Sequence, residues 1–205
     1  MTQDPHETRA SLLLRARDAS DAVAWNRLYG FYRDLIVAFA LRRGCTPQHA
    51  EDVLQETMVT LVTALPRFTY DPAKGRFRSY LLRIVSNHIV DAWRRERKMT
   101  TVVAGPHGED ILAGVADERT ESACAAWDRQ WETRVLSEAL GRVRSRVQPR
   151  TFNVFTRLVM DHRTAAEVAQ ELGLAENAVH QIRNRVLAML RHEAAAIQTE
   201  LEGTN

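Results

Sequence analysis

Apolar residues recur three and four positions apart through most of the chain, and the clearest such stretch is Phe77 to Lys98. This spacing places the apolar side chains on one face of a single long helix. They are Phe77, Tyr80, Leu81, Ile84, Val85, Ile89, Ala92 and Trp93. The other positions are mostly basic or amide-bearing, so we expect a helix that is buried on one side and cationic on the other.

A short helix is predicted over Thr8 to Arg17, followed by a longer one that ends near Arg43. Ser20 is the expected N-cap of the longer helix, with Asp21 in the first turn, and Gly44 is the expected residue after its end. The apolar set is Val23, Trp25, Leu28, Tyr29, Tyr32, Leu35, Ile36, Phe39 and Ala40. We interpret Trp25 and Tyr29 as core residues rather than ligand-binding aromatics.

Thr46-Pro47 begins the next helix, over about 47–65, with Thr as N-cap and Pro in the first turn. Its apolar positions leave Asp52, Gln55 and Glu56 together on the opposite side. Paired carboxylates can hold a metal, but no further ligands lie nearby in the sequence. We therefore interpret this patch as a polar surface or a face that docks on another protein.

Residues 66–75 are predicted to form a loop because they contain two prolines and end in Gly75. Phe68 and Tyr70 lie in this loop between Arg67 and Lys74. Aromatic rings among cations are typical of single-stranded nucleic-acid binding, in which bases stack on the rings. The same rings could instead cap the core, and the sequence favours neither alternative.

Residues 100–120 show no helical period, and helical spacing returns near Glu121 and again after Pro149. Thr164 and Glu167 then form a capping-box pattern, Gly173 breaks that helix, and another begins near Glu176. A short helix, a glycine turn and a second helix are typical of a helix-turn-helix. On the second helix the side opposite the apolar residues carries Asn177, His180, Gln181 and Asn184, flanked by Arg183 and Arg185.

The formal net charge of the 205 residues is only +2, but the charges are segregated along the chain. Basic residues dominate 74–98 and 141–163, and acidic residues dominate 104–128 between them. This pattern suggests two units that contact nucleic acid. The two cysteines are far apart, the histidines lack metal-ligand spacing, and no catalytic motif is recognisable, so we expect no enzyme, metal or cofactor. No secretory signal or membrane span is predicted, so we expect a cytoplasmic protein.

Taken together, these segments resemble bacterial extracytoplasmic-function (ECF) sigma factors of the sigma-70 family, over about residues 10–193. The resemblance rests on Ala50-Glu51-Asp52 with Gln55-Glu56, on Phe77, Tyr80-Leu81, Ile84, Asn87, Asp91 and Arg94-Arg95, and on the helix-turn-helix. It implies an all-α fold of two small helical domains joined by a flexible linker. The implied divisions are a region-2-like domain at 1–99, an acidic linker at 100–120 and a region-4-like helix-turn-helix domain at 121–205.

The resemblance implies that the chain directs transcription initiation by binding core RNA polymerase and promoter DNA. Asp52, Gln55 and Glu56 would bind the polymerase. The −10 element would be bound by Phe68, Tyr70, Lys74, Arg76, Arg78, Arg83, Asn87, Arg94 and Arg95. The −35 element would be bound by Asn177, His180, Gln181, Arg183, Asn184 and Arg185.

Two positions depart from the family's pattern: Ala175 stands where Ser or Thr is common as the N-cap, and Ala178 stands where Thr is frequent. The sequence does not show whether an anti-sigma factor is a further partner. The alternative function is a stand-alone helix-turn-helix regulator, which would leave the basic helix and the aromatic loop without a role.

Overall fold

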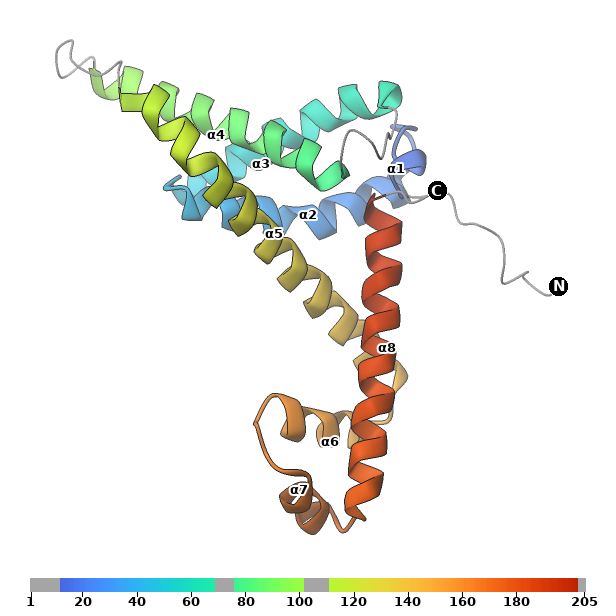
Figure 1. The fold of residues 1–205 in the computed structure, drawn as a ribbon. Coiled ribbons are helices and arrows are strands. Elements are labelled where there is room, and N and C mark those ends of the chain that lie inside the picture. Colours follow the sequence, from blue (N-terminus) through green and yellow to red (C-terminus); the bar gives the residue numbers. More distant parts are fainter. Residues whose placement is uncertain (1–11, 69–75, 102–110, 203–205) are drawn as a thin grey trace. The chain divides into compact units, whose positions relative to one another are not determined.

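The computed structural model describes residues 12–68, 76–101 and 111–202, and within these residues every regular element is a helix (Figure 1). The first helices are α1 (Leu12–Arg15), α2 (Ala22–Arg42) and α3 (Pro47–Ala64), and a 3-10 turn, η1 (Leu65–Arg67), follows α3. The later helices are α4 (Phe77–Thr101), α5 (Ile111–Arg146), α6 (Pro149–Val159), α7 (Ala165–Leu172) and α8 (Glu176–Glu202). The predicted all-α class is confirmed.

The chain divides into two compact units. The first comprises Met1–Glu132 with Thr199–Asn205, and the second comprises Thr133–Gln198. The predicted linker at 100–120 was expected to lack helical structure, but α4 reaches Thr101 and α5 begins at Ile111. Residues 111–120 include Leu112, Ala113, Ala116 and Glu118, which favour helix, and they lead directly into the amphipathic stretch that follows. The structure describes nothing between 102 and 110, so the proposed domain boundary stays a prediction.

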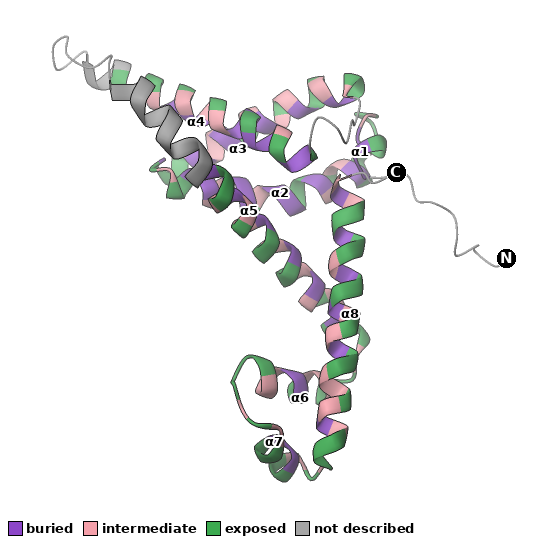
Figure 2. Ribbon diagram, viewed as in Figure 1, coloured by how far each residue is buried: buried purple, intermediate pink, exposed green. Residues whose placement is uncertain are grey.

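In the first unit, α3 packs against both α2 and α4. Figure 2 shows the buried stripes along these helices, with exposed residues on their outer sides. The fully buried side chains include Phe31, Tyr32 and Phe39 of α2, Leu54 of α3 and Phe77 of α4. Edge-to-face contacts join Tyr32 to Phe77 and Phe31 to Tyr32, with ring centroids 6.0 Å and 5.1 Å apart. The α4 face that the apolar spacing predicted is therefore the face that packs inward.

The buried side of α2 is the predicted one except at two positions. Val23 and Tyr29, which were assigned to the core, are 69% and 43% exposed, whereas Phe31 is fully buried. Trp25 is half-buried. The prediction was wrong for Val23 and Tyr29 because a helix with apolar residues on most of its sides does not reveal which of them face its neighbours.

Local signals set the helix ends in the first unit. Thr46 is the N-cap of α3, since its hydroxyl accepts a hydrogen bond from the His49 N–H at 3.2 Å. Gly44 has the positive φ of 89° expected after a helix. The N-cap of α2 is Asp21 rather than the predicted Ser20: the Asp21 carboxylate accepts from the Ala24 N–H at 2.9 Å.

The second unit contains a short helix pair, α7 and the start of α8, supported by α6. Its core is formed by Val154, Val168, Ala169 and Val179, with Leu158 packed against them. The predicted capping box is present: the Thr164 hydroxyl accepts from the Glu167 N–H, and the Glu167 carboxylate accepts from the Thr164 N–H. Gly173 ends α7 in the left-handed region, with φ of 61°. The predicted helix-turn-helix is thus observed.

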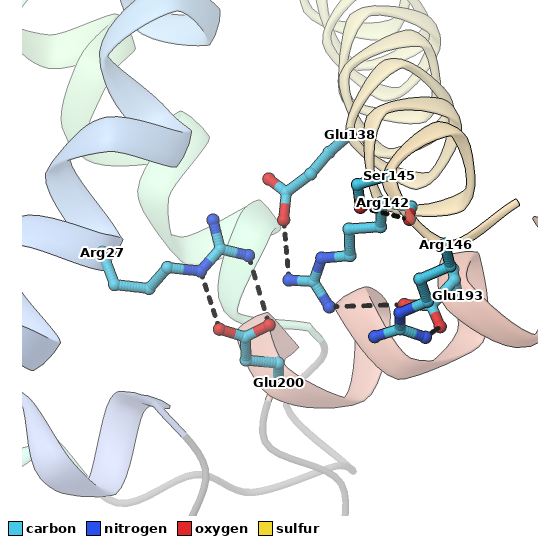
Figure 3. A network of polar contacts seen from close by, with 7 residues as sticks. All are labelled: Arg27, Glu138, Arg142, Ser145, Arg146, Glu193 and Glu200. Carbon is cyan, nitrogen blue, oxygen red and sulfur yellow. Dashed lines mark hydrogen bonds and ion pairs between the residues drawn. The ribbon is translucent and has the colours of Figure 1, made fainter. Parts of the chain in front are cut away.

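Ion pairs connect helices within each unit, and in the first unit Arg27 of α2 pairs with Glu200 of α8 at 2.7 Å (Figure 3). In the second unit, Glu193 of α8 is almost fully buried and pairs with Arg142 and Arg146 of α5. Arg142 also pairs with Glu138 at 2.7 Å, one turn earlier on α5. A buried carboxylate between two guanidinium groups orients the two helices that carry them, because separating the helices would leave the carboxylate buried without a cation.

Candidate nucleic-acid interface

Three predicted −10 contacts form an exposed stripe along α4. The side chains of Arg83, Asn87 and Arg94 are all exposed, and they lie one and two turns apart. Because each residue turns a helix by about 100°, the three fall within roughly 40° around the axis. The buried Leu81 and Val85 lie on the opposite side. The core thus holds one side of α4 and presents two cations and an amide on the other.

Arg95 lies to the side of this stripe and faces α3. Its guanidinium NH1 is 2.6 Å from the Glu56 Oε1 atom, so a predicted DNA contact is paired with a predicted polymerase contact. His88, two turns before Arg95, places its Nδ1 atom 3.2 Å from the other Glu56 oxygen. The His88 Nε2 atom lies 3.0 Å from the Thr60 hydroxyl.

The predicted docking patch on α3 is present as one surface. Gln55 is exposed, and Asp52 and Glu56 are half-buried. The hydrogen bond from Arg95 is the main reason that the pKa of the Glu56 carboxyl is lowered from its ordinary value, and His88 adds a smaller effect. Glu56 is therefore an anion at neutral pH and is already partly neutralised within the chain.

Arg78 was predicted to contact DNA, but only 8% of this residue is exposed. Its guanidinium lies 3.0 Å from Asp128 and 3.4 Å from Glu202, both within the first unit. Burial is the main cause of a raised pKa at the Glu202 carboxyl, and the Arg78 charge opposes this rise. In this structure Arg78 is an internal ion-pair residue and is not available to DNA.

The loop before α4 is described only in part. The Phe68 ring is half-buried and packs on Phe77 and Tyr80, with centroids 5.6 Å and 5.0 Å apart. This position matches the core-capping alternative for Phe68. Arg76 is exposed, immediately before α4. Tyr70 and Lys74 lie outside the described residues.

The start of α8 carries the predicted −35 residues on its outer side. Asn177, Gln181 and Asn184 are exposed, and His180 is half-buried with its Nε2 atom 3.8 Å from Glu176. On the inner side, Val179 and Val186 are fully buried and Ile182 packs against the core cluster. Arg185 is exposed and Arg183 half-buried on the two flanks. The structure therefore presents an amide-rich surface with cations beside it.

The basic block at 141–163 was interpreted as part of a nucleic-acid-contacting unit, but each of its six arginines has a partner inside the second unit. Glu193 binds two of them, and Glu171 binds Arg157 and Arg163. Arg144 lies over the Phe152 ring, and Arg150 donates to the Leu172 carbonyl at 2.8 Å. Each of these arginines therefore has a partner close by, and Arg144, Arg146 and Arg150 remain exposed.

Sequence reasoning left three exposed or half-exposed residues out of the candidate interfaces. Ser79 and Ser86 lie beside the α4 stripe, and Arg191 continues the α8 surface two turns after Asn184. Extending the same helical spacing by one or two turns would have found them. Hydroxyl and guanidinium groups at these places can donate to phosphate oxygens.

Among the described residues, no group of three or more metal-binding side chains comes together. None of the described helices is long and apolar enough to span a membrane.

Residues 28–99, which include most of α2 and all of α3, match the sequence model described as Sigma-70 region 2. The ECF RNA polymerase sigma factor RpoE of Cereibacter sphaeroides is 23% identical over 91% of this chain and 97% of its own length. The ECF RNA polymerase sigma factor BldN of Streptomyces coelicolor is 26% identical over 91% of this chain and 66% of its own length. Over most of its length the chain is therefore similar to ECF sigma factors, and residues 28–99 match Sigma-70 region 2.

The segment that matches Sigma-70 region 2 contains the exposed α4 stripe and the α3 patch, two of the three surfaces that the sequence singled out. A solved structure of the RsbN–BldN complex aligns with 88% of this chain and 97% of the matched chain, at 22% identity and a TM-score of 0.34.

Proposed function

We propose that this chain is a sigma factor of the ECF group, which directs core RNA polymerase to promoters by contacting both the −10 and the −35 elements. The observation that carries the proposal is the exposed stripe of Arg83, Asn87 and Arg94 within the segment that matches Sigma-70 region 2. A rigid helix, held by its buried face, presents these groups at fixed spacing to a polyanion. The chain itself supplies binding and position, and the polymerase supplies the chemistry.

At the −10 element, the arginines of the stripe contact phosphates and Asn87 contacts a base edge. Phosphate contacts fix the register of a protein on DNA, while hydrogen bonds to base edges read sequence. Arg76 extends the stripe toward the loop before α4, where Tyr70 and Lys74 are proposed to contact the opened strand. Phe68 packs on Phe77 and Tyr80 at the start of α4.

At the −35 element, the first turns of α8 enter the major groove. Gln181 and Asn184 are exposed, and side-chain amides can pair with the N6 and N7 atoms of adenine. Asn177 and His180 complete the surface, and Arg183 and Arg185 contact the flanking phosphates. The buried Val179 and Val186 keep this surface turned outward.

Core polymerase binds the α3 patch of Asp52, Gln55 and Glu56. These residues present two carboxylates and an amide next to one another on a helix that packs between α2 and α4. A patch of this kind fits a partner surface that carries cations and hydrogen-bond donors.

Co-purification with core polymerase, followed by sequencing of the bound DNA, tests the proposal. We expect the wild-type chain to recover a defined set of promoter sequences with both elements. The D52A/Q55A variant should lose polymerase while its helical content, measured by circular dichroism, is unchanged. Recovery of palindromic duplex sites without polymerase would instead support the stand-alone helix-turn-helix regulator.

A further inference from the structure

One ion pair joins the proposed polymerase surface to the proposed DNA surface. The Glu56 carboxylate on α3 holds Arg95 of α4 at 2.6 Å. We propose that this pair couples the two surfaces: Glu56 keeps Arg95 from DNA phosphate, and a cationic group of the polymerase that takes Glu56 releases Arg95. This inference rests on the proposed function, because it requires Glu56 to face the polymerase and α4 to face the promoter.

The two oxygens of Glu56 have different partners. Oε1 contacts Arg95, and Oε2 lies 3.2 Å from the Nδ1 atom of His88. His88 is itself positioned by Thr60, whose hydroxyl also donates to the Glu56 carbonyl at 2.8 Å. When Arg95 leaves, the Oε2 atom of Glu56 still lies beside His88 of α4.

Arg95 can change partner at little cost. Its side chain is 56% exposed, compared with 33% for Glu56, and it lies next to the exposed stripe on the same helix. Arginine binds carboxylate and phosphate with the same planar set of N–H donors, so a DNA phosphate is a direct substitute for Glu56. A long side chain at this position reaches either group by rotation about its own bonds.

The coupling acts in both directions. DNA that takes Arg95 leaves Glu56 without its strongest partner and so favours polymerase binding by the same factor. An exposed ion pair contributes little to stability, and the corresponding change in affinity is roughly two- to fivefold. A change in affinity of this size favours one order of binding without preventing either DNA or polymerase from binding alone.

The direct test measures the affinity of the free full-length chain for a fluorescent single-stranded oligonucleotide, by anisotropy at several salt concentrations. The proteins are wild type, E56Q, R95A and the double variant E56Q/R95A. We expect E56Q to bind about two- to fivefold more tightly than wild type and to show a steeper salt dependence, by about 0.7 in the log–log slope for one more phosphate contact. In the R95A background, E56Q should have no such effect.

E51Q is the matched control. Glu51 is also an α3 carboxylate, and it pairs with an arginine at 2.8 Å, but that arginine is Arg33 of α2. E51Q therefore removes the same charge and frees an arginine away from α4. If E56Q and E51Q raise DNA affinity equally, or if E56Q acts as strongly without Arg95, the gain comes from net charge and the inference is overturned.

Polymerase binding is measured separately, so failure of the inference differs from failure of the proposed function. If the wild-type chain binds polymerase but E56Q leaves DNA affinity unchanged, the coupling is wrong and the function stands. A different outcome is that E56Q acts through Arg95 as expected but no protein, wild type included, binds polymerase. Glu56 then restrains Arg95 as inferred, but release of Arg95 by polymerase is overturned together with the proposed function.

Discussion

The guanidinium carbon of Arg78 lies 4.4 Å from the centroid of the Trp131 ring. The same side chain pairs with Asp128 and Glu202, and the Arg78 carbonyl accepts a hydrogen bond from the Trp127 indole N–H at 3.1 Å. Four contacts thus meet at one residue near the start of α4. Arg78 anchors α4 within the first unit, which is a different role from that of the exposed arginines along the same helix.

We expect R78A to lower the free energy of unfolding by about 2–4 kcal/mol, because the change leaves the mostly buried Glu202 without its cation. R83A, an exposed arginine of the same helix, should change it by less than about 0.5 kcal/mol. Urea unfolding of the full-length chain followed by circular dichroism measures both. Equal stability of the two variants would show that Arg78 is not an anchor.

R83A and R94A should each weaken promoter binding by the polymerase complex and reduce its salt dependence. The expected loss is about 0.7–0.9 in the slope of log affinity against log salt for each lost phosphate contact. Arg94 also pairs with Asp91 at 3.2 Å, but both side chains are more than half exposed, so this pair competes weakly with DNA. Filter binding over a salt series checks the slopes, and an unchanged slope would mean that the stripe is merely solvated.

Substitution of Gln181 or Asn184 should change which −35 sequence is preferred. Each lost base contact should cost about 1–3 kcal/mol at one base pair and little elsewhere. The measurement is transcription from a library of promoters randomised at the −35 element. A uniform loss across the library would assign these residues to backbone positioning instead.

Ala175 precedes α8 and occupies its N-cap position, since its carbonyl accepts from the Val179 N–H at 3.2 Å. An alanine cannot supply the side-chain acceptor that a helix N-terminus lacks. A175S should therefore raise the free energy of unfolding of the second unit by about 1 kcal/mol. Thermal unfolding of A175S beside wild type tests this, and T164A provides the opposite case because it removes an existing cap of α7. A destabilised A175S variant would refute the cap assignment.

The Glu56–Arg95 pair predicts a pH dependence of stability. Arg95 holds the folded-state pKa of Glu56 below the ordinary glutamate value of 4.5, so the unfolded chain takes up this proton first as the pH falls. The contribution of the pair to stability is complete above the ordinary glutamate pKa. It is lost as the pH falls through the lower, folded-state pKa. E56Q should therefore lose less stability than wild type between neutral and acidic pH. Urea unfolding of both proteins over this pH range measures the difference. An equal loss of unfolding free energy in wild type and E56Q would contradict a stabilising Glu56–Arg95 pair.

Much of the fold followed from local signals in the sequence. Thr46 with Pro47, Gly44, and the Thr164 capping box each act within one helical turn, so their geometry does not depend on distant residues. Asp21 shows the limit of such signals, because Ser20 and Asp21 are both good caps. The structure uses Asp21, whose carboxylate also pairs with Arg15 at 2.9 Å.

The roles of individual charged residues could not be read from the sequence in the same way. Arg78 lies seven residues before the buried Val85, so helical spacing places it on the buried side of α4, away from the exposed Arg83. Spacing does not reveal its partners in α5 and at the end of α8, because those residues lie far away in the sequence. The partners of Arg146 and Arg150 could not be predicted for the same reason.

Run-off transcription with purified core polymerase tests the central claim most directly. Genomic promoter fragments are transcribed with and without the chain, and start sites are mapped. We expect discrete initiation that requires both polymerase and the chain, and that is reduced when Arg83, Asn87 and Arg94 are all replaced by alanine. Absence of chain-dependent initiation on every fragment, with polymerase active on a control sigma factor, would contradict the assignment of this chain as a promoter-specificity subunit.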